Sequence, residues 1–144
     1  MPTLTVFTPA YNRAHTLPRT YTSLQRQDCK DFIWLIVDDG STDNTAELVK
    51  EWQQRNEFEI RYIYKKNGGM HTAHNVAYEN INTELNVCID SDDELADGAV
   101  RKILEKWENI KDQDYAGIVG LDADMNTGNI IGTDFRTELA LTTL

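Results

Sequence analysis

The 144-residue chain has the size of one domain, and its 14 Lys and Arg residues against 24 Asp and Glu residues give a formal net charge of −10. A field of this sign repels the phosphate backbones of nucleic acids and anionic membrane surfaces, so we expect no nucleic-acid partner. The longest uninterrupted apolar run, residues 32–37, is too short for a transmembrane helix, which needs about 20 residues.

Strand-like and helix-like segments alternate along the chain. Short apolar runs bounded by turn residues predict strands, and apolar residues at spacings of three and four predict helices. The run 32–37 contains no alternating polar residue, which is typical of a strand buried on both faces of a parallel sheet. The strands are predicted at residues 4–7, 32–37, 60–64 and 86–89, and the helices at 15–27, 45–55, 67–78 and 99–107.

This alternation predicts an α/β fold, namely a doubly wound, mostly parallel sheet with helices on both faces. Ligands of such sheets bind beyond the carboxyl ends of the strands, and the polar segments 9–12, 38–43 and 90–94 all follow predicted strands. Later in the chain, a fifth strand is predicted at 116–122, and the turn residues 126–129 predict a hairpin back into residues 130–131.

The two cysteines and the N-terminus bear on the cellular compartment. Cys29 and Cys88 lie far apart and match no metal-ligand spacing, so we interpret them as reduced thiols. The N-terminus begins directly with strand-like residues and lacks the pattern of a signal peptide. We therefore expect a cytoplasmic protein, or one attached peripherally to the inner face of a membrane.

The segment Asp90-Ser91-Asp92-Asp93-Glu94 places four carboxylates within five positions directly after an apolar strand. Like charges this close raise each other's pKa unless a cation lies among them. Asp90 and Asp92 are two positions apart, so in an extended segment their side chains point the same way and can share one Mg²⁺ or Mn²⁺ ion. The alternative is a solvated acidic turn that caps the next helix.

The polar segments at the expected sheet edge suit a nucleotide diphosphate. A metal would neutralise the diphosphate, and the carboxylate of Asp39, which only accepts hydrogen bonds, suits the imide N–H of uracil. Tyr11 offers an aromatic face on which a base can stack. The alternative for the segment 38–43 is an Asx-turn with a helix N-cap.

Four motifs in this order and spacing resemble a family 2 glycosyltransferase with the Rossmann-like GT-A fold: Pro9 to Asn12, Val37 to Asp43, Asn67-Gly68-Gly69 through Asn75, and Asp90 to Asp93. The resemblance covers residues 4 to 98. It implies that the protein binds a nucleotide-sugar donor, most often a UDP-sugar, and transfers the sugar with inversion to a hydroxyl acceptor, as in polysaccharide biosynthesis.

The resemblance also implies roles for individual residues. Tyr11 and Asp39 would contact the base, Asp90 would approach the ribose or sugar, and Asp92, together with Asp90, would hold a Mg²⁺ or Mn²⁺ ion that bridges the diphosphate. The predicted donor-binding set is Pro9, Ala10, Tyr11, Asn12, Asp38, Asp39, Gly40, Asn67, His74, Asp90 and Ser91.

One departure from the family pattern concerns charge near the diphosphate. Many members carry Arg just before the Asn at position 75, and this chain has His74. A protonated His74 could place a positive charge against the phosphates. The alternative is that His74 is a polar helix residue without such a role.

The second departure concerns the catalytic base. Inverting transfer needs a general base to deprotonate the acceptor hydroxyl, and the family supplies it from a segment beyond the donor half. The late acids Asp122, Asp124, Asp134 and Glu138 match no motif, so the base is unassigned. We expect residues 1–144 to be one donor-binding domain that ends before the acceptor-binding segment, and the apolar residues Leu139, Leu141 and Leu144 to support self-association.

Other functional interpretations fit some of the same residues. A non-catalytic nucleotide-sugar-binding module would need no base. A Mg²⁺-dependent phosphatase with an Asp-x-Asp motif, or a receiver-like signalling domain, would carry its acidic pair after the first strand, where this chain has residues 9–12. The acceptor is open as well, because sugar, lipid-linked and protein hydroxyl groups are all compatible with the donor motifs.

Overall fold

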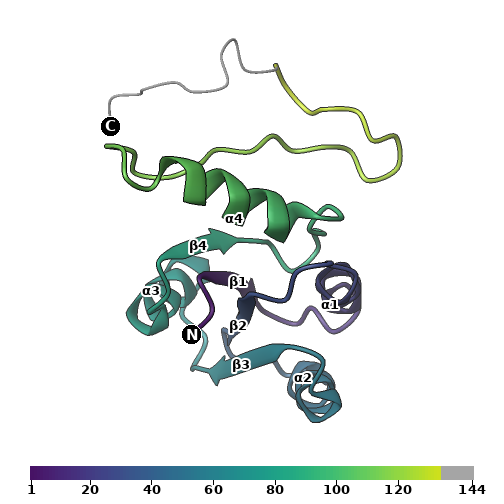
Figure 1. Cartoon of the computed structure of the whole chain (residues 1–144). Coiled ribbons are helices and arrows are strands. Elements are labelled where there is room, and N and C mark those ends of the chain that lie inside the picture. The colour runs from purple at the N-terminus through teal and green to yellow at the C-terminus, as the bar shows by residue number, and fades with distance from the viewer. Residues whose placement is uncertain (134–144) are drawn as a thin grey trace. The chain divides into compact units, whose positions relative to one another are not determined.

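The structure is a computed structural model that describes residues 1–133. The chain divides into two units, Met1–Leu104 and Glu105–Leu144. The first unit contains the sheet and the helices packed on it, and the last helix begins in the first unit and ends in the second (Figure 1). Each helix within residues 1–133 is too short or too polar to span a membrane.

Four parallel strands form the sheet, in the order β3-β2-β1-β4. Because they run in the same direction, their carboxyl ends meet at one edge, where Ala10 pairs with Asp38 and Asp38 pairs with Tyr64. The strands are β1 (Leu4–Ala10), β2 (Phe32–Asp38), β3 (Glu59–Tyr64) and β4 (Leu85–Cys88), and the helices are α1 (Leu17–Gln25), α2 (Thr45–Arg55), α3 (Met70–Asn80) and α4 (Ala99–Ile110).

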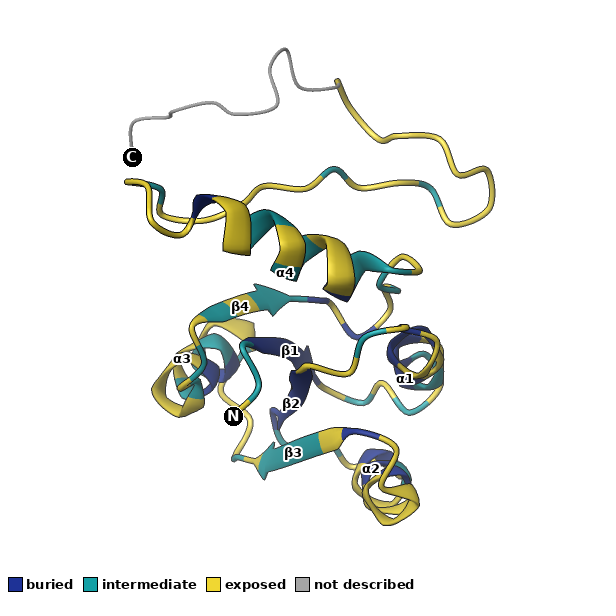
Figure 2. Cartoon of the chain, viewed as in Figure 1, coloured by how far each residue is buried: buried dark blue, intermediate teal, exposed yellow. Residues whose placement is uncertain are grey.

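Helices cover both faces of the sheet, because alternate residues of a strand point to opposite sides. Val6 and Trp34 belong to a larger apolar cluster together with side chains of α1, α2 and the start of α4. Phe7 and Val37 belong to a smaller cluster with Ala73 of α3. Both central strands are buried along their whole length (Figure 2). The predicted α/β fold with a mostly parallel sheet is therefore confirmed.

The ends of these elements agree with the predictions to within three residues. The largest difference for a strand is in β1, which was predicted to stop at Phe7 before Pro9 and in fact continues to Ala10. The main-chain carbonyl of Phe7 accepts a hydrogen bond from Ile89 N at 2.9 Å, so the nitrogen of Pro9 faces the same side, where β4 has already ended at Cys88. The proline therefore interrupts no hydrogen bond of the sheet.

The predicted fifth strand at 116–122 is wrong, because these residues form no strand in the structure. A strand needs a neighbour for its main-chain groups, and here the only pairing is a single antiparallel bridge between Ala123 and Ile130 within residues 105–133. The predicted turn between them is present. The carboxylate of Asp124 accepts hydrogen bonds from Asn126 N at 2.9 Å and Thr127 N at 2.8 Å.

Candidate functional site

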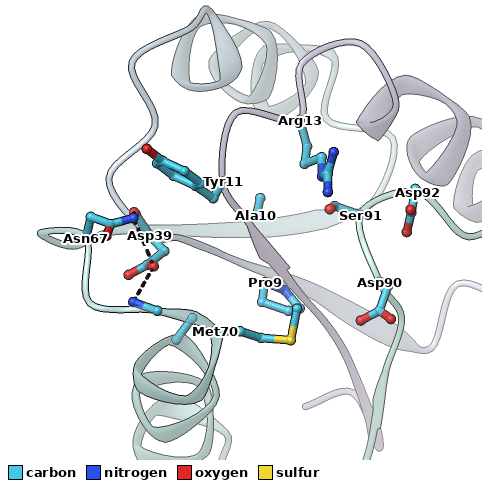
Figure 3. A pocket seen from close by; sticks show the side chains of 12 residues that line it. Pro9, Ala10, Tyr11, Arg13, Asp39, Asn67, Met70, Asp90, Ser91 and Asp92 are labelled. Carbon is cyan, nitrogen blue, oxygen red and sulfur yellow. Dashed lines mark hydrogen bonds between the residues drawn. The ribbon is translucent and has the colours of Figure 1, made fainter.

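A cavity of about 380 Å³ opens at the carboxyl edge of the sheet (Figure 3). Tyr11, Asp39 and Asn67 lie at one end of it, which we call the Asp39 end, and Asp90, Ser91 and Asp92 lie at the other, which we call the acidic end. The predicted donor and metal residues that line the cavity are Pro9, Ala10, Tyr11, Asp39, Asn67, Asp90, Ser91 and Asp92. Segments far apart in the sequence thus converge because four parallel strands end at one edge.

The predicted set of site residues and the set that lines the cavity differ in both directions. The predicted residues that do not line it are Asn12, Asp38, Gly40 and His74, and the lining residues that were not predicted are Arg13, Gly69, Met70 and Ala73. The three additional residues of α3 and its N-terminus follow directly from the predicted Asn67-Gly68-Gly69 turn.

The carboxylate of Asp39 is held by four donors, and the residue is only 4% exposed. Oδ1 accepts from Lys65 Nζ at 2.5 Å and from Gly68 N at 3.0 Å, and Oδ2 accepts from Gly69 N at 2.8 Å and from Asn67 Nδ2 at 3.3 Å. Burial alone would raise the pKa of Asp39, but the hydrogen bonds from Lys65, Gly68 and Gly69 outweigh it and lower the pKa. Asp39 is therefore a fixed, ionised acceptor.

Gly40 acts on the cavity through its backbone. Its φ of +83° lies in the region that favours glycine, and a Cβ at this position would be only 2.7 Å from the main-chain nitrogen of Asn67. This close approach lets Asn67 Nδ2 donate to the main-chain carbonyl of Asp39 at 2.9 Å. Gly40 thus places Asn67 beside Asp39 without itself reaching the cavity.

Asp38 and Asn12 tie two loops together beneath the cavity. The carboxylate of Asp38 is fully buried and accepts from Tyr62 Oη at 2.5 Å and from Ser41 N at 2.8 Å. Asn12, at φ 52°, donates its main-chain N–H to Ser41 Oγ at 2.8 Å, and its Oδ1 accepts from Thr42 N at 2.8 Å. Burial and the neighbouring Asp38 raise the pKa of Tyr62, so its hydroxyl remains a donor. Both residues hold the loops that carry Tyr11 and Asp39.

The acidic end is built differently. Asp90 and Asp92 are exposed, and within residues 1–133 neither carboxylate has a hydrogen-bond or ion-pair partner. The main chain between them forms a tight turn, in which Asp93 N donates to Asp90 O at 3.0 Å. Two carboxylates of like charge are thus left available on one wall of the cavity.

These two carboxylates fit a hard divalent cation. No group of three or more acidic, His or Cys side chains capable of holding a metal occurs in the described part of the chain. A Mg²⁺-type ion is commonly bound by one or two carboxylates with the remaining positions taken by water and substrate phosphates. Asp90 and Asp92 would supply the two carboxylates of such a site.

Arg13 is the basic residue in the cavity lining, and in Figure 3 its side chain points toward the end of the cavity that carries Ser91. His74, which was considered for this charge, lies outside the cavity, with its ring packed edge-on against Phe7 at 5.3 Å between centroids. Arg13 was not predicted from the sequence because the direction of its side chain depends on the left-handed turn at Asn12. The signal was present, since Asn is one of the few residues other than Gly that adopt this turn readily.

The described residues assign no catalytic base. Asp124 is engaged in its turn, and both Asp122 and Asp124 belong to the second unit. The other late acids, Asp134 and Glu138, and the apolar Leu139, Leu141 and Leu144, lie outside the described residues. The predictions for these positions, and for a single donor-binding domain, stay predictions.

The fold and the cavity together define an α/β protein whose ligand site lies at the carboxyl edge of a parallel sheet, with a fixed acceptor at one end and two available carboxylates at the other. Comparison with known proteins gives the family. Residues 5–139 match the model of glycosyl transferase family 2, and the chain belongs to this family. The predicted resemblance is thereby confirmed.

Several curated relatives are similar over most of this chain. The teichoic acid poly(glycerol phosphate) polymerase of Staphylococcus epidermidis is 36% identical over 74% of this chain and 15% of its own length. The GalNAc(5)-diNAcBac-PP-undecaprenol beta-1,3-glucosyltransferase of Campylobacter jejuni is 30% identical over 90% of this chain and 41% of its own length. The chain therefore spans less than half the length of these relatives.

Solved structures confirm the GT-A fold. The chain is similar to residues 1–349 of TarS from S. aureus in complex with UDP-GlcNAc, with a TM-score of 0.70 and 27% identity over 76% of this chain and 32% of that chain. The mannosyltransferase PcManGT from Pyrobaculum calidifontis, in complex with GDP-Man and Mn²⁺, is alike in fold, with a TM-score of 0.66 and 24% identity over 74% of this chain and 32% of that chain.

Proposed function

We propose that this chain is the donor-binding part of a metal-dependent, inverting glycosyltransferase whose donor is a UDP-sugar. The observation that carries the proposal is the division of one cavity into a fixed, ionised acceptor at the Asp39 end and two exposed carboxylates at the acidic end that have no hydrogen-bond or ion-pair partner among residues 1–133. A nucleoside diphosphate needs both, because its base is read by directional hydrogen bonds and its phosphates carry negative charge.

The Asp39 end favours a base with a ring N–H, as uracil has, over cytosine. Its carboxylate can only accept, so it pairs with the imide N–H of uracil and faces a repulsive lone pair at the same position of cytosine. All four acceptor positions are occupied, and the bond from Asn67 Nδ2, at 3.3 Å, is the longest of them. We expect the base to replace this bond, which frees the Asn67 amide to donate to a carbonyl of uracil. The similarity to TarS bound to UDP-GlcNAc supports the same donor class.

The acidic end and Arg13 would receive the diphosphate. Asp90 and Asp92 would hold Mg²⁺ or Mn²⁺, which, when bound, stabilises the charge on the departing nucleoside diphosphate. Arg13 would add a fixed positive charge at the same wall, a role for which arginine suits phosphate oxygens. Tyr11, which is 50% exposed, would stack on the base at the opposite end.

The alternative of a non-catalytic nucleotide-sugar-binding module is favoured by one observation, which is that the described residues assign no general base. The acceptor is proposed to be a hydroxyl of a glycan or lipid-linked glycan, since relatives are named as a glucosyltransferase acting on an undecaprenol-linked glycan and as a chondroitin synthase. Release of UDP from UDP-sugars, measured with and without hydroxyl acceptors, distinguishes sugar transfer from binding alone.

The test of the donor class is calorimetric titration with UDP, CDP, GDP and inorganic diphosphate, each in Mn²⁺ and in EDTA. We expect UDP to bind most tightly, with CDP weaker by roughly tenfold or more because one hydrogen bond to a charged group is lost. Mn²⁺ should strengthen every diphosphate ligand. Equal affinity for UDP and CDP would overturn the base assignment, and an absence of any Mn²⁺ effect would overturn the metal assignment.

A further inference from the structure

Helix α1 carries a buried row of polar side chains that the donor motifs do not explain. Thr20 and Ser23 are fully buried, and Gln27, in the turn that ends the helix, is 3% exposed. Their spacings of three and four place them on one side of the helix. Apolar side chains at such positions would pack without any need for partners, whereas buried polar groups are unfavourable unless they are hydrogen-bonded. We call these three residues the α1 polar row.

The partners of the α1 polar row lie in the segment that follows the acidic end. Thr20 Oγ1 donates to Asp93 O at 2.7 Å, and Ser23 Oγ accepts from Leu95 N at 3.0 Å. Gln27 Nε2 donates to the main-chain carbonyl of Ala96 at 2.9 Å, and its Oε1 accepts from the main-chain nitrogen of residue 100 at 3.1 Å. Each side chain thus supplies a hydrogen-bond partner to a main-chain group within residues 93–100.

The contact at Asp93 reaches the acidic end directly. Asp93 N closes the turn onto Asp90 O, and Asp93 O is the group that Thr20 holds. Arg19, the neighbour of Thr20, also donates from its guanidinium to Asp92 O at 3.3 Å. The turn is therefore fixed through its main chain, and no hydrogen bond or ion pair of the Asp90 or Asp92 carboxylate holds it within the described part of the chain.

We infer that the α1 polar row positions the acidic end for divalent metal, as a set of positioning residues that contact no ligand. Two like-charged carboxylates repel each other, so an unanchored turn would relax to separate them, and a metal would then have to pull the turn back into place. A turn that is already anchored binds without that ordering penalty. The inference rests on the proposed metal-dependent binding of UDP.

The chain offers a matched pair for the test. Thr20→Val removes the hydroxyl that holds Asp93 O and keeps the shape of the side chain. Thr22→Val makes the same change two positions away, where Thr22 Oγ1 donates only to Pro18 O of its own helix at 2.9 Å. Thr20→Ser, which keeps the hydroxyl, is the rescue variant.

Two measurements are made on the unaltered chain and on these variants: calorimetric affinity for UDP in Mn²⁺ and in EDTA, and amide hydrogen exchange of residues 90–97. We expect Thr20→Val to weaken binding in Mn²⁺ by roughly threefold to tenfold, the range of one lost hydrogen bond, and to leave the affinity in EDTA unchanged. Exchange at residues 90–97 should be faster in Thr20→Val alone. Thr22→Val and Thr20→Ser should match the unaltered chain in both measurements.

Two outcomes would overturn the inference. In the first, Thr20→Val keeps full Mn²⁺-dependent affinity although its loop amides exchange faster. In the second, binding weakens equally in Mn²⁺ and in EDTA, which would mean that Thr20 acts on the fold as a whole. If Thr20→Val does not fold, Ser23→Ala, which removes the acceptor for Leu95 N, is read by the same criteria. If Mn²⁺ does not change the UDP affinity of the unaltered chain, the proposed metal site is refuted. The exchange data would still report whether the α1 polar row holds the turn.

Discussion

The two ends of the cavity fix their acidic groups in opposite ways. At the Asp39 end, the side chain is held by four donors and the carboxylate is buried. At the acidic end, the main chain is held by α1 and the carboxylates of Asp90 and Asp92 are left to the solvent. A neutral base is best met by an acceptor whose charge is already compensated, whereas a cation is best met by charges that are not compensated.

The largest expected effect comes from removing charge at the acidic end. Asp92→Asn should abolish the Mn²⁺-dependent part of UDP binding, because it replaces a hard anionic ligand without creating a cavity. Asp97→Asn is the control, since Asp97 lies on the same segment but pairs with Arg26 outside the cavity. Calorimetry in Mn²⁺ and EDTA measures the difference. Unchanged Mn²⁺ dependence in Asp92→Asn would break the distinction between the two ends.

The second effect belongs to the Asp39 end. Asp39→Ala should weaken UDP by about 1.5–3 kcal/mol, the range of a hydrogen bond to a charged group, and should weaken inorganic diphosphate much less. Asp31→Ala is a suitable control, because Asp31 binds Thr3 at the opposite end of β2. Titration of both ligands into folded protein decides the matter. Equal weakening of UDP and diphosphate would mean that Asp39 acts through the phosphate site.

A smaller effect is expected from Arg13, which tests whether the acidic end also contributes positive charge. Arg13→Met should weaken UDP and diphosphate alike by about 1 kcal/mol, as befits an exposed charge, and should leave uridine binding unchanged. Arg61→Met, which removes a partly exposed arginine paired with Glu59 on β3, is the control. A loss for uridine as large as that for UDP would place Arg13 at the base and not at the phosphates.

The smallest effect is a shift in acid stability. The pKa of Asp39 is lowered in the folded chain, so the stability it contributes is complete above its unfolded pKa of about 3.9 and is lost as pH falls through the lower folded pKa. Lys65→Met removes one cause of the lowering and brings the folded pKa of Asp39 closer to the unfolded one, so its loss of stability in acid should be smaller and should end at a higher pH. Urea unfolding between pH 3 and 7 measures this, with Lys66→Met as the exposed neighbour control. An identical acid profile for Lys65→Met and the unaltered chain would contradict the role of Lys65.

The fold was predictable because its signals are local and strong. The uninterrupted apolar run of β2 and the apolar spacing of α2 gave both elements nearly their observed bounds. Topology then brought the loops after β1, β2 and β4 to one edge without any knowledge of side-chain positions. The segment 116–122 was mispredicted because β propensity describes a residue's fit to a sheet and supplies no neighbouring strand.

The site was less predictable, because neighbouring residues can point in opposite directions. Asp38 and Asp39 were assigned together, yet strand residues alternate, and Asp38 is buried against Tyr62 while Asp39 faces the cavity. That alternation could have been applied to the sequence. Gln27 and Thr20 could not have been identified in this way, because a polar residue on a helix gives no sign of burial until the segment 93–100 is folded against it.

The absence of an amide hydrogen at Pro9 limits how far β1 and β4 can pair. Ile89 N donates to Phe7 O in the last main-chain hydrogen bond between β1 and β4. In this register, the next hydrogen bond would be donated by the nitrogen of residue 9 to the carbonyl of residue 89. Pro9 has no N–H group and cannot donate this hydrogen bond, so the pairing of β1 with β4 stops one residue before Asp90. The chain after β4 is then free to bend away from β1, and the cavity lies between the acidic end that it carries and the loops that follow β1 and β2.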